Sequence, residues 1–145
     1  MLLPLYIIWQ GHNETGVDII DEQHRGIVSI INSLFYMMNQ GMDRQLICSC
    51  ISDTLIDYSQ LHFLTEELFL EEAEYPDLEQ HKEQHGNLNK ELQRIKRQGI
   101  MYNEVRPLLE FLKKWWFEHI NDQDQLYASH LLEFHKDSPT QESQP

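Results

Sequence analysis

The chain has 145 residues, a length typical of one domain, and its hydrophobic share of 41% is enough to fill a single core. Aspartate and glutamate outnumber lysine and arginine 24 to 11, which gives a formal net charge of −13. This charge argues against nucleic acid and against anionic membrane surfaces as partners, because both need a basic patch. It is compatible with a soluble protein.

The sequence begins with an apolar stretch that is too short to span a bilayer, so no membrane insertion is expected. This stretch also lacks a basic region and a small-residue cleavage site, which argues against a signal peptide. We therefore interpret residues 1–17 as an N-terminal arm that lies over a helical domain. Cys48 and Cys50 are too few for a disulfide framework, and a cytoplasmic location is expected.

Apolar residues recur at intervals of three and four, which is typical of amphipathic helices. The first predicted helix covers residues 18–39. The second covers residues 43–72 and is stopped by Pro76, because the residue before a proline is pushed out of the helical region. The third covers residues 77–97 and is expected to be closed by Gly99.

The fourth predicted helix has Asn103 as its N-cap and continues to at least Ile120. Residues 126–134 are expected to form a short extra helix, and the polar residues 136–145 a flexible tail or linker. Since short connections make successive helices antiparallel neighbours, we predict an all-α fold, an up-down-up-down antiparallel four-helix bundle over residues 18–135.

Polar residues interrupt the apolar stripe of each predicted helix. Burying one such side chain without a partner costs a few kcal/mol. A single core histidine is usually only a hydrogen-bonded residue, but five of them with a glutamate, on four helices, favour a shared ligand. The interrupting residues are His24, His62, Glu66, His81, His85 and His119.

The spacing of these residues supports a common site. The pairs on the second and third helices are four residues apart and therefore share a helix face. Asp124 follows His119 by five residues, which would splay the two side chains on a continuous α-helix. We therefore expect Asp124 to lie where the fourth helix ends or bends.

Imidazole and carboxylate ligands suit iron, zinc, copper or nickel. Seven side chains exceed one tetrahedral or octahedral site, so two metal ions are predicted, with both carboxylates able to bridge them. Two divalent ions and two carboxylates leave a charge of +2, which one bridging hydroxide lowers to a value that a protein core tolerates better.

These residues resemble the hemerythrin family, and specifically its bacteriohemerythrin domains, over about residues 9–124. The motifs that carry the resemblance are Ile20-Asp21-Glu22-Gln23-His24, His62-Phe63 with Glu66-Glu67, Tyr75-Pro76, His81 with His85, and Trp115-Trp116-Phe117-Glu118-His119-Ile120 followed by Asp124.

The resemblance implies two iron ions, Fe²⁺ or Fe³⁺, with a bridging oxo or hydroxo group and dioxygen as the ligand. By this resemblance, one iron is bound by His81, His85 and His119, and the other by His24 and His62. The carboxylates of Glu66 and Asp124 bridge the two irons. Dioxygen would bind at an open position on the two-histidine iron.

The residues expected around the dioxygen pocket are Trp116, Ile120 and Trp115. The family usually has leucine where this chain has Trp116. Two interpretations remain open: the indole narrows or reshapes the pocket, or it turns toward a neighbouring helix as packing.

Several other polar residues fall outside the pattern. His12, His130 and His135 are interpreted as surface histidines, and Glu67 as a solvated carboxylate rather than a ligand. Cys48 is expected to be a small core residue.

Three functions fit such a site. We predict a module that senses dioxygen or redox state within a larger signalling protein, because the tail resembles a linker and because domains of this kind occur fused to diguanylate cyclases and chemotaxis receptors. A free-standing protein for dioxygen storage or delivery is the alternative. An enzyme that scavenges nitric oxide or peroxide is the weakest, since the sequence offers no general acid, general base or substrate pocket beyond the metals.

Overall fold

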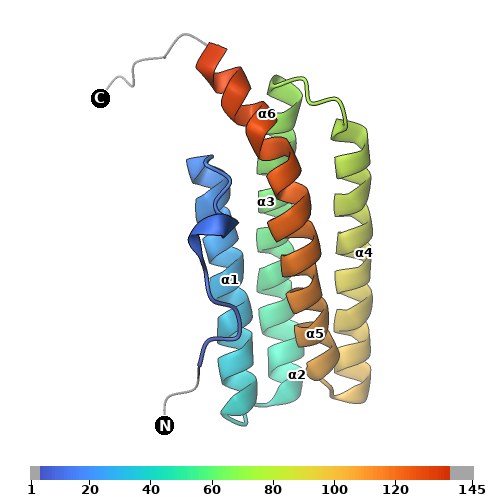
Figure 1. Cartoon of the computed structure of the whole chain (residues 1–145). Coiled ribbons are helices and arrows are strands. Elements are labelled where there is room, and N and C mark those ends of the chain that lie inside the picture. Colours follow the sequence, from blue (N-terminus) through green and yellow to red (C-terminus); the bar gives the residue numbers. More distant parts are fainter. Residues whose placement is uncertain (1–3, 138–145) are drawn as a thin grey trace, which may run out of the picture.

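The computed structural model describes residues 4–137, apart from the side chains of Ile51 and Asp137, and within this range the regular structure is helical throughout. Four long helical segments run side by side and alternate in direction (Figure 1). The first segment contacts the second and the fourth, and the third contacts the same two, so the four close into a bundle. The predicted antiparallel four-helix bundle is confirmed.

The first helix, α1, covers Asp18–Asn39, as predicted. It follows a short turn, η1, at Gly11–Asn13. The second segment is less regular than predicted, because a π-helical stretch interrupts it near its start. Its parts are α2 (Arg44–Leu46), η2 (Ile47–Ile51) and α3 (Ser52–Glu72).

The third helix, α4, covers Leu78–Tyr102 and therefore runs past Gly99, which we expected to close it. A Cβ atom at Gly99 would lie 2.9 Å from the backbone oxygen of Glu104 and 3.0 Å from Sγ of Cys48. The glycine thus permits close packing inside the helix. Asn103, predicted to begin the next helix, instead closes α4 in the left-handed conformation, with φ of 54°.

The fourth segment continues past Ile120, and the extra helix that we expected as a separate element is joined to it. It consists of α5 (Arg106–Trp115), the π-helical η3 (Trp116–Gln123) and α6 (Asp124–Asp137), without a break between them. The expected extra helix at residues 126–134 is part of α6. The tail expected from residue 136 still has two helical residues at its start, and residues 138–145 lie outside the described part, as do residues 1–3 of the arm.

The described part of the arm, residues 4–17, lies along α1 (Figure 1). The side chain of Ile7 is buried, and its backbone N–H and C=O each form a 2.8 Å hydrogen bond with the side-chain amide of Asn32. Tyr6 stacks on Phe35 with ring centroids 4.7 Å apart. Within residues 4–137, every helix is too short or too polar to cross a lipid bilayer.

Two apolar clusters fill the bundle. The larger cluster includes Ile27, Ile31, Leu34, Leu55, Phe63, Leu92, Leu108, Leu112, Trp116 and Ile120. The smaller cluster consists of Val17, Ile20, Leu70, Ala73, Tyr127 and Leu131. Along three of the four segments, the predicted site residue falls between a member of one cluster and a member of the other. The candidate site therefore lies in the interior, between two apolar regions.

Candidate metal centre

The bundle brings all seven predicted ligands together in its interior, and all seven are buried. Their ligand atoms form two groups, each within 4.8 Å. The two-histidine group consists of His24, His62, Glu66 and Asp124. The three-histidine group consists of His81, His85, His119, Glu66 and Asp124. The two carboxylates belong to both groups.

Each oxygen of Glu66 faces a different group. Oε1 lies 2.8 Å from Nε2 of His62 and 3.4 Å from Nε2 of His24. Oε2 lies 3.0 Å from Nε2 of His81 and 3.1 Å from Nε2 of His85. A carboxylate in this position is oriented to bridge two metal ions.

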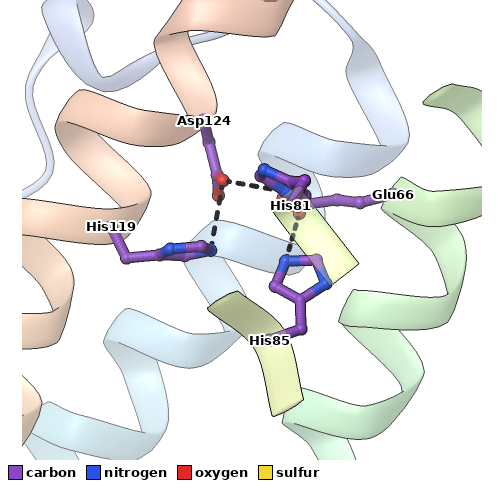
Figure 2. Close-up of side chains that lie close together, drawn as sticks. All are labelled: Glu66, His81, His85, His119 and Asp124. Carbon is purple, nitrogen blue, oxygen red and sulfur yellow. Dashed lines mark hydrogen bonds and ion pairs between the residues drawn. The ribbon is translucent and has the colours of Figure 1, made fainter. Parts of the chain in front are cut away.

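Asp124 is placed in the same way. Its Oδ2 lies 3.1 Å from Nε2 of His24, and its Oδ1 lies 3.6 Å from Nε2 of His81 and 3.4 Å from Nε2 of His119. Figure 2 shows the five side chains of the three-histidine group pointing toward one another, with Asp124 and Glu66 reaching the histidines from different helices.

The five-residue spacing of His119 and Asp124 is explained by the π-helix η3. The backbone N–H of Asp124 donates to the carbonyl oxygen of His119, five residues earlier. A π-helix places residues five apart on one face, whereas an α-helix does so for residues four apart. The helix therefore does not end at Asp124, which was one of the two alternatives that we expected; it continues into α6 after a π-helical stretch.

Several ligand atoms lack hydrogen-bond partners among the described residues. Nε2 of His85, Nε2 of His119 and Oδ1 of Asp124 are buried and make no hydrogen bond. Nε2 of His85 nevertheless lies 3.1 Å from Oε2 of Glu66, and Nε2 of His119 lies 3.4 Å from Oδ1 of Asp124. The approach angles are wrong for a hydrogen bond. Lone pairs that converge without shared protons are what a pair of cations would satisfy, so the residues fit two metal ions.

The electrostatics point the same way. Burial acts to raise the pKa of Glu66, but His62 and hydrogen bonds from the surrounding histidines hold that pKa well below its usual range. Burial and the charge of Glu66 raise the pKa of Asp124 well above its usual range. The protein alone thus tolerates one buried carboxylate charge but resists the second, which bound cations would stabilise.

Burial also lowers the pKa of His119 to about 3. At neutral pH this imidazole is therefore uncharged and offers a lone pair, as metal binding requires. Burial lowers the pKa of His62 as well, but there the charge of Glu66 and hydrogen bonds to Asp124 and Glu66 together outweigh burial, and the pKa is raised.

Three residues make contacts at the site that the sequence pattern did not predict. The Nδ1 of His62 contacts Oε1 of Gln23 at 3.0 Å, and the Nδ1 of His85 contacts Oε1 of Glu67 at 2.9 Å. Glu67 is only 22% exposed at its side chain, so the prediction that it is a solvated carboxylate is wrong. The Tyr127 hydroxyl donates to Glu66. The one signal in the sequence was that Gln23 and Glu67 directly adjoin predicted ligands.

Of the three histidines predicted at the surface, His12 and His135 are exposed. His130 is half-buried, and its Nε2 donates a 2.6 Å hydrogen bond to the carbonyl oxygen of Ala73. It holds α6 to the end of α3 and is not a surface residue. Cys48 is buried, as predicted.

The candidates for a dioxygen pocket lie on two sides of the site. Trp116 is 1% exposed and meets His24 edge-on, with centroids 6.3 Å apart, while Trp9 of the arm covers it at 5.7 Å. Trp116 thus packs against the two-histidine group and the arm together. Trp115 instead contacts Phe63, which stacks on His85 in the three-histidine group. Ile120 is buried in the larger cluster.

A four-helix bundle with histidines and bridging carboxylates in its core defines a class of metal-binding helical proteins. The profile of the family described as Hemerythrin HHE cation binding domain matches residues 15–131. The chain therefore belongs to the hemerythrin family. Hemerythrins bind a di-iron centre, and the cluster found in this chain is suited to two metal ions.

Individual relatives agree with this assignment. The chain is 33% identical over 133 residues to the bacteriohemerythrin of Stenotrophomonas maltophilia, and the aligned region covers 88% of this chain and 86% of that protein. It is 28% identical over 125 residues to the bacteriohemerythrin of Clostridium acetobutylicum, covering 83% and 97%. The crystal structure of a wild-type hemerythrin superposes with a TM-score of 0.75 at 28% identity, covering 87% of this chain and 98% of that one.

Proposed function

We propose that this chain binds dioxygen reversibly at a di-iron centre held by His24, His62, Glu66, His81, His85, His119 and Asp124. The observation that carries the proposal is the placement of both carboxylates, each of which turns one oxygen toward each histidine group. When bound, the iron pair supplies the electrons and the open coordination position that dioxygen needs. We assign His24 and His62, the group with fewer ligands, to the dioxygen side.

The protein's own residues favour binding over oxidation of a substrate. Five neutral imidazoles and two carboxylates donate little negative charge, and such a ligand set disfavours the high-valent iron that oxygenases use. Apolar clusters flank the site, and His24 and His62 are fully buried, so the surroundings of the two-histidine group exclude water and protect a bound ligand from loss by protonation.

Metal analysis tests this proposal. After anaerobic addition of ferrous iron and removal of the excess, we expect about two irons per chain, and a visible absorption band that forms with dioxygen and disappears under argon. His119→Gln should lower the iron content, whereas His135→Gln, at an exposed histidine, should not. One zinc per chain, or no metal-dependent visible absorption, would contradict the proposal.

We further propose that the domain senses dioxygen or redox state and passes the signal along α6. The support is that Asp124 is both a bridging candidate and the first residue of α6, which continues to Asp137 in one piece. Any displacement of Asp124 is therefore transmitted to the C-terminal helix.

Free-standing storage or delivery of dioxygen is the second candidate. It is favoured by the relatives named bacteriohemerythrin, since the matched region covers 86% and 97% of the length of two of them. Hydrogen exchange in residues 124–137 separates the two roles. A sensor should show protection that differs between the diferrous, dioxygen-loaded and diferric forms. Equal protection in all three forms would favour storage or delivery.

A further inference from the structure

The histidines of the site differ in what their outer ring nitrogens contact. Nδ1 of His85 meets a carboxylate oxygen of Glu67 at 2.9 Å. Nδ1 of His62 meets the amide oxygen of Gln23 at 3.0 Å. Nδ1 of His24 is buried and has no hydrogen-bond partner among the described residues. The three-histidine group thus has a charged outer partner, and the two-histidine group has one neutral partner and one nitrogen without any.

The orientation of Gln23 follows from the helix backbone. The hydroxyl of Thr65 donates its only proton to the carbonyl oxygen of Leu61, at 2.8 Å. Thr65 Oγ1 must therefore accept from the amide nitrogen of Gln23, which lies 3.0 Å away. The amide oxygen then faces His62, so Nδ1 of His62 carries the proton and Nε2 presents its lone pair to the site.

Glu67 fixes His85 in the same tautomer as Gln23 fixes His62, but its acceptor is a charged carboxylate and not a neutral amide. A carboxylate accepts only, so Nδ1 of His85 is the protonated nitrogen and Nε2 is free for metal. The ring is also held in place by Phe63, which stacks on it with centroids 4.0 Å apart. A charged acceptor draws the Nδ1 proton outward more strongly than an amide does, and this makes the imidazole a stronger donor to a metal.

We propose that Glu67 and Gln23 are positioning residues that make the two metal sites unequal. This inference rests on the proposed di-iron function. Glu67, through His85, strengthens the three-histidine site and favours ferric iron there. The neutral Gln23 and the unpartnered nitrogen of His24 leave the two-histidine site as the weaker donor. The two-histidine iron is therefore the first to be reduced, and the first to be lost.

Two isosteric substitutions test the proposal. Glu67→Gln should weaken the tighter metal-binding step about 10- to 100-fold in a stepwise titration of the metal-free protein with ferrous iron. It should also raise the lower of the two one-electron reduction potentials. Gln23→Glu should lower the higher potential. Each substitution therefore narrows the separation between the two reduction potentials. We expect a change of ~59 mV, which corresponds to about a tenfold change in the equilibrium constant for electron transfer between the two irons.

Glu71→Gln is the matched control, since it removes the same charge from an exposed position one turn further along α3. It should leave the separation unchanged. A separation that is unchanged or wider in Glu67→Gln or Gln23→Glu, with two irons retained, would overturn the proposal. If Glu67→Gln loses its iron altogether, the Gln23→Glu potential decides alone.

The iron content of the unsubstituted protein separates this test from that of the proposed function. Fewer than two irons there would count against the function itself. Two irons with normal dioxygen binding, and no change in the separation of potentials in either variant, would overturn only the roles of Glu67 and Gln23.

Discussion

Tyr127 reaches from α6 to α3 and donates a 2.7 Å hydrogen bond from its hydroxyl to Oε1 of Glu66. Both side chains are fully buried. Burial and the charges of Asp124 and Glu66 raise the pKa of Tyr127 well above its usual range, so the hydroxyl keeps its proton and remains a donor. The carboxylate that faces both histidine groups is thus held by a tyrosine from outside the cluster.

Tyr127→Phe should therefore destabilise the fold, because it leaves an oxygen of a buried carboxylate with one donor fewer. Hydrogen bonds to charged groups contribute about 1.5–3 kcal/mol, and we expect a loss of that size in the free energy of unfolding. Urea unfolding of the metal-free protein measures it. Tyr75→Phe is the control, since it removes a hydroxyl from a half-buried tyrosine that packs edge-on against the Tyr127 ring, with centroids 6.4 Å apart. Equal stability of Tyr127→Phe and the parent would contradict the role of the hydroxyl.

Trp116→Leu should open space beside His24, because the indole is fully buried against that imidazole and against Trp9. We expect azide to bind faster to the oxidised, iron-loaded protein, and stability to fall by on the order of 2 kcal/mol from the cavity. Stopped-flow absorption measures the rate. Trp115→Leu makes the same change on the side of Phe63 and should leave the azide rate unaltered. Equal rates in both variants would mean that Trp116 does not limit access.

Gly99→Ala should destabilise the protein by about 1–3 kcal/mol, because the new Cβ would press on the Glu104 carbonyl and on Cys48. Gly86 is the matched control on the same helix, since a Cβ there meets no atom within 4 Å. Gly86→Ala should stabilise by about 0.5–1 kcal/mol through the better helix propensity of alanine. Thermal unfolding of the pair measures both. Destabilisation by Gly86→Ala as large as that by Gly99→Ala would refute the packing argument.

The metal-free protein should lose stability on acidification between about pH 6.5 and pH 3. The folded His119 has a pKa of about 3, because burial disfavours its charged form. The unfolded histidine takes up a proton below about pH 6.5. In that window the unfolded state binds more protons, so the free energy of unfolding falls as the pH falls. Urea midpoints across the window should decline less steeply in His119→Gln; an identical decline would contradict the assignment.

The residues of the candidate site could be picked out from the sequence because they occupy gaps in apolar stripes whose period is set by the helix itself. His24 between Ile20 and Ile27 is such a gap, and burial of both neighbours in the structure bears out the stripe. The end of α4 could not be predicted in this way. Glycine and asparagine both favour the left-handed conformation, and the structure uses Asn103 for it, whereas Gly99 stays helical where a Cβ would meet Cys48 of a distant segment.

The contacts of Gln23, Glu67 and Tyr127 also lay beyond the sequence. Each joins two helices, over separations of 39, 18 and 61 residues, so its partner depends on how the helices are rotated against each other. Periodicity predicts which face of a helix is buried, but not which atoms of the facing helix it meets.

The π-helix η3 has a consequence for every residue that follows it. Each wide turn accommodates one residue more than an α-helical turn, and one residue corresponds to a rotation of about 100° around the helix axis. Deleting a single residue within Trp116–Gln123 would therefore turn Tyr127 and Leu131 away from the smaller cluster while Leu108 and Leu112 stayed in the larger one. Two requirements therefore set the length of η3. It must place His119 and Asp124 on one face of the helix, and it must turn Tyr127 and Leu131 of α6 toward the smaller cluster.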